Sequence, residues 1–458
     1  MVQCVSSGVV RVASGRFAPG HLGELTQIVP FEMVDEVLAS ARRVQARVRD
    51  LPSRVVVYLL LAAALFSELG YGQVWARLVS GLDGDGGDGR GGVPVARPSS
   101  SALCQARRRV GPGPLRALFD LLRGPVPGAV RWRGLLVCAL DGTTMVIPNG
   151  EPNVAAYGRH AAGPNGDAGY PILRLLTVVA CGTRTILDAV FGPCDVGETT
   201  YAPRLLGCLR QGMLLLADRN FAVKDLFEGI AATQADLLVR CKANRRLKPV
   251  RHCGDGTWLT RIGELTLRVI EAEIVVHCAG GPSRTGRYRL LTTLTDHHRY
   301  PATGLVELYH HRWEIETSYL ELKSTTLGGR VLRARTPDGI EQEVYALLIT
   351  YQALRTAIAD ATLTRPDTRP DTRPDRGSFT IALNTARDQI IHAAGVIADT
   401  TIDLIGTIGR AVHAALLPTR RSRTSPRIVK RASSKHRAQG LTDRNNYRTT
   451  HTVHILDG

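Results

Sequence analysis

Two aspartates have the type and setting that divalent-cation chemistry on phosphates requires. Asp141 follows the apolar run LLVCAL, and Asp218 follows the apolar run MLLLA. Each carboxylate is therefore expected at the carboxyl end of a buried strand, where open sheets bind their ligands. Carboxylate oxygens there suit Mg²⁺ or Mn²⁺, because hard cations prefer oxygen ligands. An aspartate at a strand end is also common as a structural cap, so neither acid alone predicts catalysis.

A third acid, Glu316, lies in the segment YHHRWEIETSYLELK among residues with a distinctive spacing. Successive separations of three, four and seven residues join Tyr309, Arg312, Glu316 and Lys323. On a regular α-helix this spacing places all four within an arc of about 60°. Such a stripe is usually a surface salt-bridge ladder. It also suits phosphate chemistry, in which Glu316 completes a metal shell and the other three side chains contact DNA phosphates.

The elements between these acids have the order of an α/β domain. From Leu135, short apolar runs predict three strands, with a Gly-Thr turn between the second and third. A helix, the strand MLLLA, the helix KDLFEGIAATQA and the strand DLLVRCKA follow. This is the order of an RNase H-like core, a mixed sheet flanked by helices, although other α/β arrangements share it. Residues 242–303 alternate like strands between Gly and Pro residues and predict a β-rich insertion.

Helical patterns precede and follow this core. Amphipathic and apolar stretches predict short helices over residues 31–123. One of them opens with a serine cap and carries three consecutive basic residues, Arg107, Arg108 and Arg109. A DNA-binding headpiece and a solvated helix face both fit that cluster. After the core, repeated TRPD sequence predicts a linker, and residues 420–437 hold eight Lys or Arg and no acid.

These patterns divide the chain into five parts. The expected parts are a helical N-terminal DNA-binding domain at 1–128, a catalytic core at 129–241 and 304–360, a β-rich insertion at 242–303, a linker at 361–377, and a C-terminal helix with a basic tail at 378–458.

Composition narrows the classes of partner and compartment. Lys and Arg number 58 against 41 Asp and Glu, a net charge of +17 that favours a polyanionic partner such as nucleic acid, with an acidic lipid surface as the other candidate. The longest apolar run, residues 55–66, is too short to span a bilayer, so it predicts a buried helix and no membrane. Without a signal-peptide pattern the expected location is the cytoplasm, with nucleoid association on DNA. Nine cysteines without a Cys-x-x-Cys pair predict reduced thiols.

The motifs LDGTTMVI and LLLADRNF, together with the Tyr-x2-Arg-x3-Glu-x6-Lys signature, resemble the three acidic motifs of DDE transposases of the IS-four group of insertion sequences. The segments GHLGELTQIVPFEMVDEVL and LPSRVVVYLLLAAALF are similar to the amino-terminal domain of that group in actinobacterial-type elements. A long β insertion between the second and third acids also fits. The resemblance covers most of the chain.

The resemblance implies a role for each matched residue. Asp141, Asp218 and Glu316 would hold two Mg²⁺ or Mn²⁺ ions per active site. Tyr309, Arg312 and Lys323 would contact phosphates near the cleaved bond. Tyr288, in the segment YRLLT, occupies the place of an aromatic that stacks on a base flipped from the duplex, although tryptophan can stand there in the family. Trp258 competes for that role but is expected to be a packing residue.

The resemblance also implies a reaction and its partners. The enzyme would catalyse cut-and-paste transposition by metal-dependent hydrolysis and strand transfer at terminal inverted repeats, through a hairpin intermediate. Cutting two ends in concert implies a homodimer on DNA. Two rival functions are a structure-selective nuclease or resolvase on the same fold, and a DNA-binding relic without activity. The presence of all three acids disfavours the relic.

Overall fold

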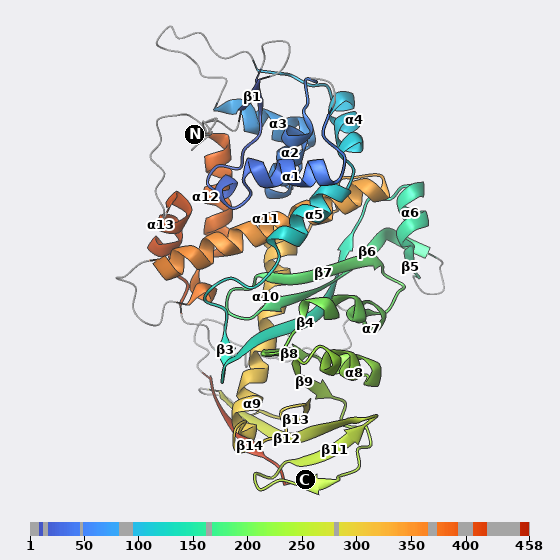
Figure 1. Ribbon diagram of the computed structural model, residues 1–458, viewed down its shortest axis with the longest axis vertical. Coiled ribbons are helices and arrows are strands. Elements are labelled where there is room, and N and C mark those ends of the chain that lie inside the picture. The colour runs from blue at the N-terminus through green and yellow to red at the C-terminus, as the bar shows by residue number, and fades with distance from the viewer. Residues whose placement is uncertain are drawn as a thin grey trace. The chain divides into compact units, whose positions relative to one another are not determined.

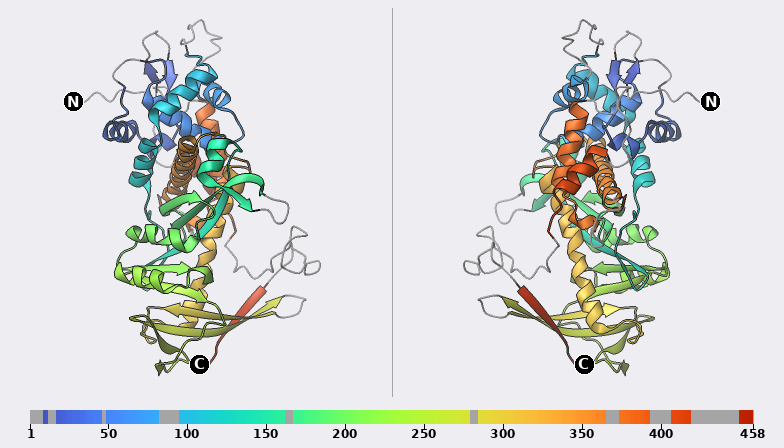
Figure 2. Two further views of the ribbon diagram at one scale, coloured as in Figure 1. Left: turned by 90° about the vertical axis from the view of Figure 1, so that its right-hand side faces the viewer. Right: turned by 90° about the vertical axis from the view of Figure 1, so that its left-hand side faces the viewer.

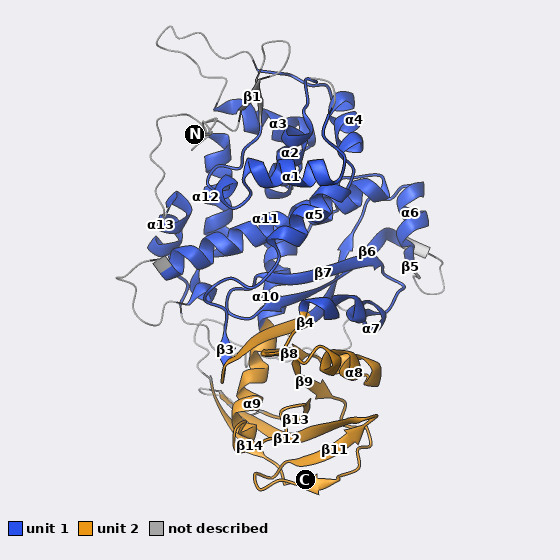
Figure 3. Ribbon diagram, in the orientation of Figure 1, with its two compact units in different colours: residues 1–132, 141–208, 314–418 blue, residues 133–140, 209–313, 419–458 orange. Residues whose placement is uncertain are grey.

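The structure is a computed structural model that describes residues 9–11, 17–45, 49–81, 95–161, 167–278, 284–364, 373–392, 406–418 and 449–457. The chain forms two compact units, neither of which is continuous in sequence (Figure 3). Unit 1 consists of Met1–Trp132, Asp141–Cys208 and Glu314–Pro418. Unit 2 consists of Arg133–Leu140, Leu209–Trp313 and Thr419–Gly458. The five functional parts expected from the sequence remain a prediction, because compactness alone divides the chain differently.

Unit 1 begins with the strands β1 (Val9–Arg11) and β2 (Phe17–Pro19) and continues into short helices. These helices are α1 (Phe31–Ser40), α2 (Ser53–Leu65), α3 (Tyr71–Ser80), α4 (Ser100–Val110) and α5 (Gly113–Leu122). The expected buried helix is confirmed, since every residue of α2 except Arg54 is buried. The expected serine cap is also confirmed, because the Ser99 hydroxyl accepts a hydrogen bond from the backbone N–H of Ala102.

The C-terminal helices of unit 1 pack on these N-terminal helices. They are α11 (Pro337–Thr364), α12 (Phe379–Ile391) and α13 (Gly406–Ala414). Helix α11 is 28 residues long and contacts α2, α5 and α13, while α12 contacts α3 (Figures 1 and 2). Apolar faces that are far apart in sequence therefore share one helical core.

The rest of unit 1 is built around an antiparallel pair of strands. β6 (Asp167–Ala180) and β7 (Ile186–Pro193) form this pair, and Leu173 to Val179 face residues Pro193 to Ile186. The turn between them contains Gly182 with φ +89° and Arg184 with φ +60°. The expected Gly-Thr turn is confirmed. Other elements of this part are α6 (Glu151–Tyr157), β5 (Arg159–Ala161), α7 (Glu198–Tyr201) and a 3-10 segment (Ala202–Cys208).

Unit 2 contains the parallel strands. The first six residues of β4 (Leu135–Val146) belong to it, and β4 pairs in parallel with β8 (Met213–Ala217). β8 pairs in parallel with β9 (Asp236–Cys241), after the helix α8 (Lys224–Ala232). The order of elements is that of the RNase H-like core that the sequence predicts. Strands β4, β6 and β7 come first, and the parallel strands β8 and β9, joined by α8, follow them.

The β-rich insertion is an antiparallel extension of unit 2. Its strands are β10 (Arg251–His252), β11 (Trp258–Ile262), β12 (Leu265–Cys278) and β13 (Arg284–Thr292), and β13 pairs with β9. One further strand was not expected. β14 (Thr449–Ile455), from the end of the chain, pairs with β12 over Ala272 to Cys278. The predicted C-terminal part, a helix and a basic tail, therefore also contributes a strand to this sheet.

The helical stretch after the insertion differs from the expected regular α-helix. It consists of α9 (Ala302–Tyr309), a 3-10 turn (His310–Arg312), α10 (Trp313–Leu320) and a π-helical segment (Glu321–Thr326). The angle per residue changes at both irregular segments, so a continuous stripe drawn on one α-helix is wrong in detail. Tyr309 and Arg312 belong to unit 2, whereas Glu316 and Lys323 belong to unit 1.

Some expectations lie outside the described residues. These are most of the TRPD linker and the basic tail at 420–437. Among the helices that the structure describes, none combines the length and apolar character needed to cross a membrane.

Candidate active site

Asp141 lies within β4, where the strand passes from unit 2 to unit 1. The residues before it, Leu136 to Leu140, are buried, and residues 141–144 are half-buried. The sequence pattern placed Asp141 at a strand end, which is wrong because β4 continues to Val146. Its Oδ1 accepts a hydrogen bond of 2.8 Å from the backbone N–H of Gly142. This contact restricts the carboxylate rotamer.

The helix that carries Glu316 is tied to the same strand within unit 1. Tyr319 follows Glu316 by three residues, close to one helical turn, so both lie on the same side of α10. The Tyr319 hydroxyl donates a 2.6 Å hydrogen bond to the backbone carbonyl of Asp141. Further along, the Lys323 ammonium donates to Thr143 Oγ1 at 3.1 Å. The side of the helix that bears Glu316 therefore faces the strand that bears Asp141.

Burial tunes two of these side chains. Burial raises the pKa of Tyr319 well above its usual value, and the nearby Asp141 carboxylate adds to the rise. The hydroxyl therefore remains a donor. Burial lowers the pKa of Lys323, because a half-buried ammonium loses solvation. A phosphate bound close to Lys323 would offset the lost solvation of its ammonium group.

A fourth acid, Glu198, lies against Gly142, the residue after Asp141. Its carboxylate forms a 3.0 Å ion pair with Arg174, and a Cβ added to Gly142 would collide with its oxygen. Glycine at position 142 thus permits the close approach of Glu198 to the β4 backbone. No local signal in the sequence distinguishes Glu198 from the other acids of the chain.

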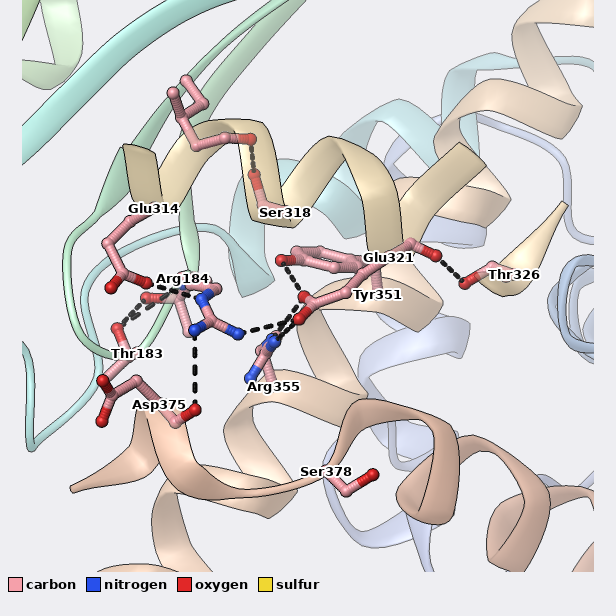
Figure 4. A network of polar contacts seen from close by, with 12 residues as sticks. Thr183, Arg184, Glu314, Ser318, Glu321, Thr326, Tyr351, Arg355, Asp375 and Ser378 are labelled. Carbon is pink, nitrogen blue, oxygen red and sulfur yellow. Dashed lines mark hydrogen bonds and ion pairs between the residues drawn. The ribbon is translucent and has the colours of Figure 1, made fainter. Parts of the chain in front are cut away.

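The opposite side of the helix is held by a buried network of charges in unit 1 (Figure 4). Glu314 and Glu321 form ion pairs with Arg184, at 2.6 and 2.8 Å. Arg355 of α11 also pairs with Glu321, and the Tyr351 hydroxyl donates to the same carboxylate at 3.1 Å. Two arginines and two glutamates balance in charge, as burial of ions requires.

Electrostatics within this network favour its charged form. Burial by itself would lower the pKa of Arg184, but Glu321 and Glu314 together raise it above the usual arginine value. Each of the four charged side chains is less than a tenth exposed. The π-helical segment starts at Glu321, so the ion pairs with Arg184 and Arg355 stabilise the irregular turn.

Asp218 directly follows β8 in unit 2, as its sequence pattern predicts. Its Oδ1 accepts a 2.7 Å hydrogen bond from the backbone N–H of Asn220. The preceding residue is held by Tyr309, whose hydroxyl donates to the carbonyl of Ala217 at 3.0 Å. Burial raises the pKa of Tyr309, although Arg312 opposes the rise. The Tyr309 hydroxyl was expected to contact a phosphate and instead contacts the protein backbone here.

A pocket of about 370 Å³ in unit 2 opens beside Asp218. Its lining is dominated by basic and aromatic side chains, namely Arg219, Arg240, Arg312, Tyr288, Tyr309, His310 and Trp313, together with Asp218, Ile274 and Val306. Arg240 lies over the Tyr288 ring at 4.2 Å, and Arg312 lies over Trp313 at 5.1 Å. Such a lining suits a phosphate and a flat aromatic ligand together.

Residues outside this pocket have other surroundings. Trp258 is only 7% exposed within β11, as expected of a packing residue. Among the three consecutive arginines of α4, Arg107 lies over the ring of Tyr71 at 3.7 Å, and Arg108 is exposed. Arg109 is half-buried. Its pKa is lowered mainly by loss of solvation and secondly by repulsion from Arg49.

The chemistry of the three predicted acids fits hard cations, because all their donors are carboxylate oxygens. Asp141 and Glu316 belong to unit 1 and Asp218 to unit 2. Among the residues described, no group of three or more His, Cys, Asp or Glu is arranged to hold a metal ion. The donor types thus fit Mg²⁺ or Mn²⁺, and a three-ligand site would require the acids to converge.

Two family models match the chain in order. Residues 19–120 match the insertion element 4 transposase N-terminal family, and residues 132–353 match the transposase DDE domain family. The second match spans Asp141, Asp218 and Glu316.

Known transposases are similar over long stretches. The transposase InsG for insertion sequence element IS4 of Escherichia coli is 26% identical over 429 residues, which cover 88% of this chain and 91% of InsG. The putative transposase InsZ of Escherichia coli is 28% identical over 203 residues, 43% of this chain and 64% of InsZ. A cryo-EM structure of the piggyBac transposase synaptic complex with hairpin DNA aligns with a TM-score of 0.44 and 14% identity, over 89% of this chain and 86% of that chain.

Proposed function

The chain belongs to the DDE transposases of the IS4 group, and from this premise we propose that it catalyses cut-and-paste transposition of an insertion sequence. The substrates are double-stranded terminal inverted repeats and target DNA. All steps are phosphoryl transfers at one active site formed by Asp141, Asp218 and Glu316. Because two ends must be cut in concert, the active species is a homodimer on DNA.

One observation carries the assignment of the first two acids. Leu140 of β4 pairs with Ala217 of β8 in a parallel register. Asp141 and Asp218 are each the next residue along the chain. Adjacent parallel strands therefore lead directly into the two aspartates, which supports a shared role for their carboxylates. The tether from Tyr319 to Asp141 supports the inclusion of Glu316.

We infer that these three residues bind two Mg²⁺ or Mn²⁺ ions when DNA is present. Bound cations of this kind lower the pKa of the attacking water and stabilise the departing 3′ oxygen. The three carboxylates must converge for this, and their hydrogen bonds to Gly142 and Asn220 already restrict two of them. Lys323 and Arg312 hold the phosphates on either side of the reacting one.

The reaction begins with hydrolysis at the element end. Water attacks the phosphorus, and the bond from phosphorus to the 3′ oxygen breaks, which leaves a 3′-OH and a 5′ phosphate. The 3′-OH then attacks a phosphodiester of the opposite strand, forms a hairpin and displaces the 3′ oxygen of the flanking DNA as a 3′-OH. Water reopens the hairpin and leaves a 3′-OH and a 5′ phosphate. Each freed 3′-OH finally attacks a phosphodiester of the target DNA and displaces a target 3′-OH. No side chain acts as a nucleophile in these steps.

The pocket in unit 2 has a place in this scheme. We infer that a base flipped out of the duplex stacks on Tyr288, while Arg240 moves from the ring or covers the other face of the base. Among the α4 arginines, Arg108 is exposed and available to a phosphate, whereas Arg107 is engaged with Tyr71. Arg109 is half-buried, so its contribution to phosphate binding is small at most.

The test is incubation with end DNA and Mg²⁺, followed by strand-resolved analysis of the products. Asp141→Asn, Asp218→Asn and Glu316→Gln should each bind end DNA like the unaltered protein and lose nicking by about a thousandfold or more. Glu264→Gln, at an exposed turn, is the matched control and should nick normally. Retained nicking by any of the three variants removes that residue from the catalytic set. Cleavage of branched DNA without paired inverted repeats would favour a structure-selective nuclease instead.

A further inference from the structure

The Tyr319 hydroxyl is bonded at the junction of three elements of unit 1. It donates to the carbonyl of Asp141 on β4 at 2.6 Å and accepts from the backbone N–H of Thr177 on β6 at 3.2 Å. The Thr177 hydroxyl lies 3.0 Å away. Tyr319 itself is only 7% exposed. One buried oxygen atom thus joins the helix of Glu316 to the backbone of Asp141 itself.

The helix is held on its other side as well. Glu314 and Glu321 both bind Arg184 (Figure 4). Tyr319 of the same helix binds β4 instead. Arg184 fixes the helix along its length, because its two partners lie seven residues apart. It does not fix the separation of the helix from β4. Among the contacts described here, those of Tyr319 and Lys323 span that separation, and that of Tyr319 is the shorter.

We propose that Tyr319 is a positioning residue that sets the separation between Glu316 and Asp141, and thereby the affinity of the site for divalent cations. This inference rests on the proposed function, in which both acids bind the cations. Carboxylates that share a cation must be held to within about half an ångström. Loss of the hydroxyl leaves the aromatic ring in place, but Asp141 and Thr177 each lose a partner and the helix can move relative to β4.

The decisive variant is Tyr319→Phe, with Tyr58→Phe as a matched control. Tyr58 is also fully buried in unit 1, and its hydroxyl donates to the backbone carbonyl of Val29 at 2.7 Å. Its bond does not involve an acidic residue of the site. Both substitutions remove one buried hydroxyl from a carbonyl, so both should lower the melting temperature, and Tyr319→Phe should lower it more because Thr177 also loses a partner.

Cation affinity separates the two variants. Mn²⁺ is titrated into the full-length protein bound to pre-cleaved end DNA, so that no strand is cut, and bound Mn²⁺ is followed by electron paramagnetic resonance. For Tyr319→Phe we expect the Mn²⁺ dissociation constant to rise about tenfold, as for other residues that orient metal ligands. The affinity for DNA should change less than about twofold. The Mg²⁺ concentration for half-maximal nicking should rise in parallel, and excess Mg²⁺ should restore most of the rate.

Three results would overturn the proposal. The first is an unchanged Mn²⁺ affinity in Tyr319→Phe, and the second is an equal loss of affinity in Tyr58→Phe, which would indicate general destabilisation. If Tyr319→Phe does not fold, Thr177→Val removes the partner hydroxyl and keeps its shape. An unchanged Mn²⁺ affinity in Thr177→Val is the third result that would overturn the proposal. Failure of the proposed function is distinct, because Asp141→Asn would then nick DNA like the unaltered protein.

Discussion

At the scale of single residues, the two aspartates are held by the same kind of local hydrogen bond. Each carboxylate accepts a hydrogen bond through Oδ1 from a backbone N–H shortly after it in sequence, that of Gly142 for Asp141 and that of Asn220 for Asp218. A tyrosine hydroxyl from the segment that carries Glu316 then holds the adjoining backbone carbonyl in each unit. Backbone and rotamer are both restricted before any ligand binds, which lowers the cost of assembling a cation site.

Lys323 gives a prediction about phosphate binding. Its ammonium bonds Thr143, two residues beyond Asp141, and the proposed function places a DNA phosphate beside it. Lys323→Met should weaken end binding and reduce the slope of log affinity against log salt by about one. Fluorescence anisotropy at several salt concentrations measures both. Lys224→Met, which changes an exposed lysine of α8, is the control and should leave the slope unchanged. An unaltered slope in Lys323→Met would show that this side chain does not contact phosphate.

The lowered pKa of Lys323 adds a prediction about stability for the same variant. The unfolded chain binds the proton more tightly than the folded protein, so the charge of Lys323 opposes folding below its folded pKa. This opposition disappears as the pH rises through the interval between the folded and unfolded pKa values. Lys323→Met should therefore melt at a higher temperature than the unaltered protein at pH 7. The difference should shrink toward alkaline pH, and a pH-independent difference would contradict this account.

At the scale of elements, the segment from α9 to the π-helical turn is shaped by contacts on opposite sides. Tyr309 anchors its start in unit 2, and Glu314 and Glu321 anchor its later part in unit 1. Two deviations from α-helical geometry adjoin these anchors: the 3-10 turn lies between Tyr309 and Glu314, and the π turn begins at Glu321. Irregular helical turns are frequently found at functional sites for this reason, since they allow side chains to satisfy contacts that a regular helix would not align.

The buried ion pairs predict a large and partly recoverable loss of stability. Arg355→Met leaves Glu321 with one arginine fewer in a fully buried setting and should cost about 3–5 kcal/mol of unfolding free energy. The double variant with Glu321→Gln should cost less than the sum of the single variants, by about 0.5–3 kcal/mol. Urea denaturation measures each value. Arg261→Met, which breaks an exposed pair with Glu264, should cost no more than about 1 kcal/mol. Strict additivity in the cycle would refute the coupling.

At the scale of the whole molecule, charge is distributed unevenly along the chain. The net charge is +17, and residues 420–437 contribute eight positive charges without an acid. This stretch precedes β14, which pairs with β12 and so attaches the end of the chain to unit 2. Eight positive charges without an acid in one stretch favour contact with DNA phosphates.

Neutralising that segment tests its contribution. Replacement of its eight Lys and Arg by Gln leaves β14 in place and should reduce the salt slope of DNA binding by about 0.9 for each phosphate that the segment no longer neutralises. The decrease should be the same for end DNA and for unrelated DNA, because charge neutralisation does not read sequence. Binding isotherms on both DNAs measure it. A decrease confined to end DNA would mean that the segment reads sequence, against this expectation.

The amino-acid sequence by itself determined which residues could do the chemistry and most of the elements that carry them. Apolar runs ending at Asp141 and Asp218, the strand order around them and the spacing of the third acid are local patterns, and side-chain periodicity reports them directly. The β-rich insertion is also local, because alternating residues and turn signals mark each strand.

Only the tertiary structure decided how those residues are held. Tyr319 meets Asp141 across 178 residues, and Arg184 meets Glu314 across 130, so no pattern in a short window could reveal either contact. The pairing of β14 with β12 and the interruption of the helix around Glu316 arise in the same way. Such contacts depend on which surfaces the folded chain brings together, and the burial of paired charges and hydroxyls then overrides the local helical preference.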